Sequence, residues 1–413
     1  IVLYKKEHLL GVTMQQIASD GWSMAIILKE VAEIYSSYEQ KRQANLASLP
    51  LQYADYAIWQ RQYLQGEILE KKLQYWKEKL AGVASLQLPL DYQQPAIQSI
   101  RGSIKNFTID PELSEGLRII GQKQAATLFM TLLASFKVLI FRYCSQKDIC
   151  IGTPIANRQQ QEVEGMIGFF VNMLALRTEI SGELSFAEVL QKVKATTMGA
   201  YEYQDVPFEK VVDAVVKERE MSRSPLFQVA FAFQNKPEAP EIRLGELLMI
   251  NEEFDQLTSK FDITFFIKES ASGLHATIEY CSDLYLEQTI ERMISHFQQL
   301  LSSIVKQPLQ SIAELPMLVK EEKYQLLQEF NNNKADYPKD KTLIDLFEEQ
   351  VSKPPDNISV EFEDGKYTYQ ELNEYANQLG HYLREKGIKE EALVPVCLDR
   401  SLEMIVGILG ILK

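Results

Sequence analysis

Hydrophobic positions recur every three to four residues in some stretches of the chain and alternate with polar positions in others. The first pattern is typical of helices, which we expect at about 24–36, 69–80, 126–143, 286–305, 343–351 and 369–386. Alternation and short apolar runs predict strands, at about 103–109, 149–151, 174–180, 229–233, 261–267, 275–280 and 358–362. Ser23 is expected to cap the first helix, and Ser185 to open a further one. Because strands and helices interleave without a regular βαβ repeat, the sequence predicts an α/β or α+β fold with a mixed sheet.

The chain has 413 residues, enough for two to three domains at about 150 residues each. A stretch of linker composition, which includes Asn331–Asn333 and Pro338, predicts a break at about 316–341. The unit that follows is small for an independent core, so we expect it to be incomplete. The chain begins at Ile1 and stops at Lys413 in mid-pattern, which leads us to expect a piece of a longer protein.

The charge balance narrows the possible partners. Lys and Arg total 43 against 57 Asp and Glu, a net charge of −14, and such an acidic chain repels nucleic-acid phosphates. The longest apolar run, Met404–Leu412, is far shorter than the ~20 residues of a membrane span, so we expect no membrane partner. Four cysteines lack metal-like spacing and predict reduced thiols in a cytoplasmic protein: Cys144, Cys150, Cys281 and Cys397.

The histidines offer no recognisable catalytic cluster, since the four of them are scattered at His8, His275, His296 and His381. One string is unusual, Gln15-Gln16-Ile17-Ala18-Ser19-Asp20-Gly21-Trp22-Ser23, between a predicted strand ending near Val12 and the first helix. Catalytic groups often lie at such junctions. A tight turn with Asp20-Gly21 at its corner and Ser23 as the helix cap is the alternative, and on physical grounds alone it is the favoured interpretation.

The string also resembles the His-His-x-x-x-Asp-Gly active-site motif of condensation domains from nonribosomal peptide synthetases. Gln15 and Gln16 replace both histidines, whereas Asp20 and Gly21 match. Four more signatures of that family follow in the expected order, at Tyr53–Gln60, Ile167–Asn172, Tyr203–Glu209 and Arg219–Leu226. With the Gln15-Gln16 string counted as the first motif, these are the second to the fifth. The fourth motif begins with Tyr203 instead of the usual His, and the fifth has Glu220 instead of Asp. Five collinear motifs make the resemblance highly specific.

A second resemblance covers the carboxyl-terminal part. Thr368–Leu372 is similar to the first core motif of adenylation domains, and Ile411–Lys413 is similar to the opening of the second. The two resemblances together imply four segments. These are the remainder of a condensation-domain amino-terminal lobe with the active-site motif (1–95), the carboxyl-terminal lobe (96–315), a linker (316–341) and a truncated adenylation-domain start (342–413).

The resemblance implies a fold like that of chloramphenicol acetyltransferase, with two lobes in a V, here partly truncated, and the active site at their junction. It implies that carrier proteins deliver donor and acceptor on phosphopantetheine arms, and that the acceptor amine attacks the donor thioester to form an amide. No cofactor is expected to bind directly; ATP and Mg²⁺ belong only to a complete adenylation domain. The expected partners are the two carrier domains and the downstream adenylation domain. With most of one lobe missing, we expect poor solubility of this polypeptide alone, because an interface becomes exposed.

The substitution at Gln16 changes the expected chemistry. In the family, the second histidine removes a proton or positions the amine, the aspartate holds the loop through a salt bridge, and the glycine allows a close turn. A carboxamide does not titrate near neutral pH, so Gln16 cannot supply general base catalysis. We therefore expect an impaired condensation domain, most similar to those that join two L-residues, and whether this chain is an enzyme stays open.

Other interpretations compete with this one. The strongest is a non-catalytic condensation-like module that docks carrier proteins or recruits a tailoring enzyme. A heterocyclisation domain would need aspartate where Gln15 stands, and an epimerisation domain would not be followed directly by an adenylation domain. A deliberate or accidental replacement of both histidines is a further alternative.

Overall fold

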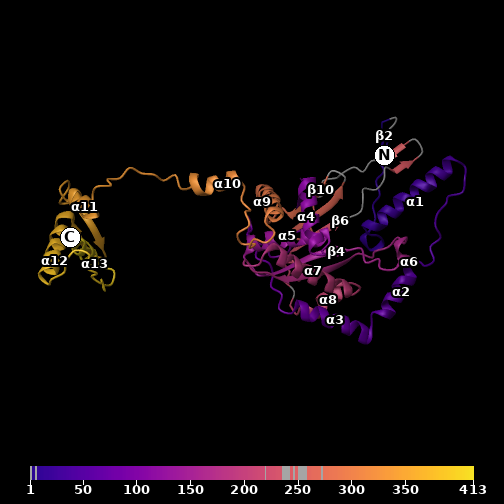
Figure 1. The fold of residues 1–413 in the computed structure, drawn as a ribbon, viewed down its shortest axis with the longest axis horizontal. Coiled ribbons are helices and arrows are strands. Elements are labelled where there is room, and N and C mark those ends of the chain that lie inside the picture. The colour runs from indigo at the N-terminus through magenta and orange to yellow at the C-terminus, as the bar shows by residue number, and fades with distance from the viewer. Residues whose placement is uncertain are drawn as a thin grey trace. The chain divides into compact units, whose positions relative to one another are not determined.

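The computed structural model describes residues 2–4, 7–218, 220–234, 242–244, 247–249, 258–270 and 273–413. They form two compact units, Ile1–Tyr324 and Gln325–Lys413 (Figure 1). Arg219, the first residue of the fifth motif, lies outside the described residues. Two small antiparallel hairpins, β1–β2 (Val2–Tyr4, Glu7–His8) and β7–β8 (Ile242–Leu244, Leu247–Met249), also belong to the first unit.

A six-stranded sheet forms the centre of the first unit. Its strands run in the order β3 (Gly102–Ile109), β10 (Gly273–Cys281), β9 (Ile263–Ser270), β6 (Val229–Gln234), β4 (Asp148–Ile155) and β5 (Asn172–Glu179). Neighbours are antiparallel at both edges, whereas β6 pairs in parallel with β9 and with β4. The mixed sheet predicted from the sequence is therefore confirmed.

Four helices enclose the core on the sheet: α4 (Pro111–Lys123), α5 (Leu128–Cys144), α7 (Phe186–Glu202) and α9 (Glu287–Lys306). Helix α5 contacts the other three and strand β4. It is apolar on almost every side, as a fully surrounded helix must be, and Phe136 at its centre packs against Phe265 with ring centroids 4.4 Å apart. Among the described residues no single helix is long and apolar enough to cross a membrane; only the bent pair α4–α5 meets those criteria, by length and composition.

The helices near the Gln15-Gln16 string are α1 (Gly21–Glu39), α2 (Tyr53–Tyr63) and α3 (Gly66–Leu80), with a 3₁₀ turn, η1, at Gln16–Ala18. The prediction that Ser23 caps α1 is wrong. The helix begins three residues earlier, and Asp20 is its N-cap, because the Asp20 carboxylate reaches the Ser23 amide at 2.8 Å. The strand expected to end near Val12 is also absent, since residues 9–15 lie in neither helix nor strand.

Two further helices complete the surroundings of the motifs, α6 (Gln161–Glu164) and α8 (Phe208–Val215). The expected opening of α7 at Ser185 is confirmed by a capping box with Glu188. The predicted linker contains two short helical turns, α10 (Lys320–Tyr324) and η2 (Gln325–Glu329).

The second unit is built from α11 (Leu343–Val351), β11 (Ile358–Phe362), β12 (Gly365–Thr368), α12 (Tyr369–Glu385) and α13 (Leu402–Leu412). Its small core centres on Leu372, Ala376 and Leu409. Thr342 and Thr368 each begin a helix with a capping box, as their spacing from Asp345 and Glu371 requires. The residue limits assigned to the four segments from the sequence remain predictions.

Candidate functional site

The carboxylate of Asp20 is the centre of a hydrogen-bonded cluster. As the N-cap of α1, its Oδ1 accepts hydrogen bonds from the backbone amide and the hydroxyl of Ser23, both at 2.8 Å. Its Oδ2 accepts from the backbone amide of Phe170 at 3.1 Å. Asp20 therefore fixes the start of α1 to the segment that carries the third motif.

Arg158, in the loop after β4, is the charge that faces Asp20. Its Nη2 lies 3.2 Å from Asp20 Oδ1, and the two side chains are only 1% and 4% exposed. Its Nη1 donates to the carbonyls of Val163 and Met166 at 2.6 and 2.7 Å, and its guanidinium lies 4.0 Å from the centre of the Phe170 ring. A buried ion pair whose members make further hydrogen bonds is the arrangement that keeps both charges stable.

The electrostatics keep Asp20 ionised. Burial by itself raises the pKa of this carboxyl, but the hydrogen bonds from Ser23 and Phe170 and the charge of Arg158 outweigh it and hold the pKa below its ordinary value. Asp20 is consequently a fixed anion near neutral pH and is unsuited to donate a proton. Its geometry supports the structural role that the resemblance implies.

Ser23 connects the first motif to the third. Its hydroxyl lies 2.9 Å from the Gly168 carbonyl oxygen and accepts from the Gly168 amide at 3.1 Å and from Arg158 at 3.0 Å. Beside it, the Tyr53 hydroxyl donates to the Phe169 carbonyl at 2.8 Å. A Cβ atom on Gly168 would lie 2.2 Å from the Tyr53 ring, so only glycine fits there without displacement.

Asn172 connects the third motif to the fourth. Its Nδ2 donates to the carbonyls of Gln204 and Val206 at 2.9 and 2.7 Å, and its Oδ1 accepts from the amide of Phe208 at 2.9 Å. Four of the five motifs are therefore brought together. The described part of the fifth makes other hydrogen bonds: the Ser222 and Ser224 carbonyls accept from Gln94 and Gln228.

Gln15 and Gln16 are both exposed, but only Gln16 lines the wall of an open cavity of about 480 Å³. The wall also includes Asp20 and Gly21, and its other side chains are mostly apolar: Val12, Met14, Met24, Phe169 and Val171, with Ser19. A Cβ at Gly21 would meet no atom of the described chain within 4 Å. Glycine there leaves room in the cavity and is not demanded by the backbone.

The carboxamide of Gln16 forms a hydrogen bond with Lys260, and both side chains are exposed. The Lys260 ammonium Nζ lies 3.2 Å from Gln16 Oε1. An ammonium can only donate, so its partner must be the amide oxygen. The NH₂ group is then the part of Gln16 that is left to interact with a molecule in the cavity.

Sequence reasoning missed Arg158 and Lys260. Both are single basic residues in loops, outside all five motifs, and they lie 138 and 244 residues from their partners along the chain. In one sequence such a charge has the appearance of an ordinary solvated residue. The apolar run before Arg158 predicts a strand but gives no sign that the following loop turns inward.

The comparisons with known proteins agree with this geometry. The family model "Condensation domain" matches residues 1–327, and the model "AMP-binding enzyme" matches residues 347–413. A linear gramicidin synthase of Brevibacillus parabrevis is 46% identical over 402 residues, which are 97% of this chain and 8% of that protein. Gramicidin S synthase 2 of Brevibacillus brevis is 41% identical over 414 residues, 100% of this chain and 9% of that protein. The chain thus spans less than a tenth of each of these relatives.

Two solved structures carry the comparison into three dimensions. One is a holo four-domain nonribosomal peptide synthetase bound to AMP and glycine (TM-score 0.75, 25% identity, 95% of this chain, 30% of that one). The other is the complex of the X-domain and OxyB from teicoplanin biosynthesis (TM-score 0.67, 27% identity, 74% and 69%). Residues 1–327 therefore belong to the condensation-domain family of nonribosomal peptide synthetases, and the chain continues into an AMP-binding domain at residues 347–413.

Proposed function

We propose that residues 1–327 bind two carrier-borne substrates and form an amide between them at a low rate, because Gln16 occupies the position of the catalytic histidine. The observation that carries the proposal is the intact Asp20 cluster beside a cavity that Gln16 lines. The framework that would aim a catalytic side chain is present, and the side chain itself has changed. A subtype that joins two L-residues is part of the same proposal.

The reaction balances without a cofactor. The acceptor amine forms a bond to the carbonyl carbon of the donor thioester, the carbon–sulfur bond breaks, and one proton passes in net from nitrogen to sulfur. Both substrates arrive on phosphopantetheine arms of carrier domains. ATP and Mg²⁺ serve only a complete adenylation domain, and among the described side chains no three of the His, Cys, Asp and Glu type form a metal-binding group.

Gln16 can assist this reaction only in part. With its oxygen engaged by Lys260, its NH₂ group can donate a hydrogen bond to the oxygen that becomes negative as the amine attacks. It cannot remove the proton from the amine. A positioned general base contributes about 10²–10⁴-fold to such reactions, and this is the factor that we expect the domain to lack.

The decisive experiment is single-turnover amide formation by the intact module with loaded donor and acceptor carriers. The Gln16→His variant is expected to form product at least tenfold faster than the natural sequence. Gln15→His, which changes the neighbouring side chain outside the cavity, is the matched control and is expected to leave the rate unchanged. Equal rates for the natural sequence and Gln16→His would refute the impairment.

A second function, recruitment of a partner enzyme without chemistry, is favoured by one comparison. The X-domain of teicoplanin biosynthesis is named in a complex with OxyB, and it shares this fold at 27% identity. If the present domain acts in the same manner, Gln16→His should not restore amide formation, while carrier proteins and a tailoring enzyme should be retained specifically by the immobilised module.

A further inference from the structure

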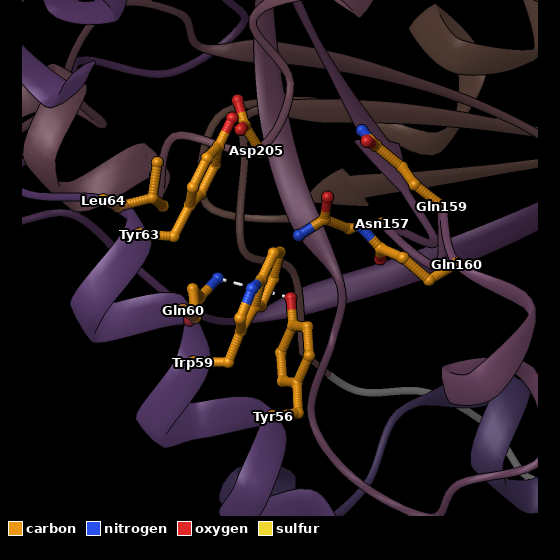
Figure 2. A pocket seen from close by; sticks show the side chains of 9 residues that line it. All are labelled: Tyr56, Trp59, Gln60, Tyr63, Leu64, Asn157, Gln159, Gln160 and Asp205. Carbon is orange, nitrogen blue, oxygen red and sulfur yellow. Dashed lines mark hydrogen bonds between the residues drawn. The ribbon is translucent and has the colours of Figure 1, made fainter. Parts of the chain in front are cut away.

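A second, smaller cavity of about 210 Å³ lies on α2 and the loop 157–160, which also carries Arg158 (Figure 2). It is separate from the cavity at Gln16, because the two share no lining residue. Drug-sized ligand sites usually have about 300 Å³ or more. This cavity therefore suits one segment of an extended chain better than a whole small molecule.

Aromatic rings form one wall. Trp59 and Tyr63, one turn apart on α2, are stacked at 5.3 Å with an interplanar angle of 5°, and Tyr56 lies 5.7 Å from Trp59. Trp59 is 44% exposed although it lines the cavity. An exposed, rigid ring surface can stack against a flat group of a ligand at small entropic cost.

Carboxamides form the opposite wall. Asn157, Gln159 and Gln160 come from the loop, and Figure 2 shows them across from the aromatic side chains of α2, which also contributes Gln60. Each carboxamide has donors and an acceptor at once, the same combination that a secondary amide presents. Gln160 is the N-cap residue of α6, yet its side chain makes no capping hydrogen bond within the described chain. It is therefore available to a ligand.

The charge of the cavity argues against an ionic ligand. Its charged lining group is Asp205, and the Lys72 ammonium lies 2.9 Å from that carboxylate. An anion would approach a carboxylate, and a cation would find that carboxylate already engaged. A ligand without net charge meets neither penalty, and its amides can bond to the carboxamide wall.

We propose that this cavity binds the secondary amides of a neutral, extended ligand, which is either a peptidyl chain or the pantetheine arm of a carrier. The choice of a peptidyl chain or a pantetheine arm as the ligand rests on the proposed function. The expectation that the ligand contains secondary amides rests on the side chains that line the cavity. The cavity is also joined to the Asp20 cluster: Arg158 stands between Asn157 and Gln159, and Tyr56 packs on Phe170 at 4.8 Å. A ligand held here lies against the loop that fixes Asp20.

Trp59 gives a direct measurement. The chain has three tryptophans, and Trp76 is 2% exposed, whereas Trp59 is 44% exposed. The full chain is titrated with pantetheine in one arm and with N-acetyl-dialanine methylamide in the other, while tryptophan emission is followed. We expect a saturable change with at least one probe that is lost in Trp59→Phe. Saturation by pantetheine alone assigns the site to the carrier arm, and saturation by the peptide alone assigns it to the peptidyl chain.

Matched variants test the carboxamide wall. Gln160→Leu and Gln159→Leu each remove one neutral hydrogen bond to the ligand and should weaken binding about two- to tenfold. Gln161→Leu, the next residue but outside the lining, should bind like the natural chain. Thermal unfolding shows whether each variant is folded. Because Gln159 and Gln160 are changed separately, each variant gives its own measurement of probe affinity.

Three results would overturn the proposal. The first is the absence of a saturable emission change with either probe, and the second is equal probe affinity in Gln160→Leu, Gln159→Leu and Gln161→Leu. The third is displacement of the bound probe by inorganic phosphate as effectively as by the unbound probe itself. None of them depends on catalysis. If the chain binds a probe but forms no amide, either with the natural Gln16 or as Gln16→His, the proposed function is contradicted and the binding site is still supported. A chain that forms amides but binds neither probe does the reverse.

Discussion

The guanidinium of Arg158 lies 3.2 Å from the carboxylate of Asp20, and both side chains are almost fully buried. The pair joins the amino-terminal loop to the segment after β4, and the same guanidinium also binds two carbonyls and the Ser23 hydroxyl. Because both side chains are almost fully buried, water could not solvate either charge if the other were removed. The buried ion pair therefore acts together with the hydrogen bonds from Phe170 and Gly168 to hold the segment that follows Gln16.

Replacing Arg158 by Met should destabilise the first unit strongly. The change leaves the Asp20 carboxylate buried without its counter-charge, and removal of one partner of a buried pair typically costs about 3–5 kcal/mol. All three tryptophans lie between residues 22 and 76, so urea unfolding followed by tryptophan emission reports this unit and not the second. The double variant Asp20→Asn with Arg158→Met should lose less than the sum of the single changes. A loss below about 1 kcal/mol in Arg158→Met would show that the pair is not needed.

Adding one methyl group at Gly168 should also be costly. The new Cβ would lie 2.2 Å from the Tyr53 ring, next to the hydrogen bonds between Gly168 and Ser23. Overpacking of this kind typically costs about 1–3 kcal/mol. Gly165→Ala is the matched control, since its Cβ would meet its nearest atom, on Leu49, at 3.4 Å. The same urea experiment compares the two, and equal stability of both variants would contradict the packing argument.

The sequence predicted the elements and the motifs far better than the contacts between them. Ser23 and Asp20 are both good N-cap residues, so local preference cannot decide which one begins α1. In the structure the Asp20 carboxylate accepts from both the amide and the hydroxyl of Ser23, and the same hydroxyl also contacts Gly168, so tertiary contacts accompany the cap. The partner of Asp20 could not be found either, because the fold of the sheet alone brings Arg158 to it.

Lys137 shows the same limit inside a correctly predicted helix. Its neighbours in α5 are apolar, and periodicity would place a lysine on the surface. The structure instead buries it completely, with Nζ 3.0 Å from the Ile149 carbonyl and 3.0 Å from the Thr178 hydroxyl, and a further bond to the Leu176 carbonyl. Three oxygens supplied by β4 and β5 satisfy a charge that a pattern of hydrophobic positions cannot foresee.

The stability of the first unit should rise between pH 7 and pH 10 because of Lys137. Burial lowers its pKa from 10.5 to about 7, so the unfolded chain binds more protons in this range and stability increases with pH. Below pH 7 the full cost of the buried ammonium is present. At about 1.4 kcal/mol per pKa unit the gain is about 5 kcal/mol at most, reduced by the three oxygens that favour the charged form. The stability difference between the natural chain and Lys137→Met isolates this effect, and a difference independent of pH would contradict it.

Within the first unit, Glu322 should hold α10 against α9. Its Oε2 lies 2.5 Å from Nε2 of the buried His296, whose Nδ1 lies 2.7 Å from the Tyr143 hydroxyl. Hydrogen bonds to charged groups are worth about 1.5–3 kcal/mol, so Glu322→Gln should increase local opening of α10 about tenfold or more. Trypsin cleavage after Lys323, followed by mass spectrometry, measures that opening. Glu321→Gln on the exposed side of the same short helix should leave the cleavage rate unchanged, and equal acceleration by both variants would mean that only the charge of the helix matters.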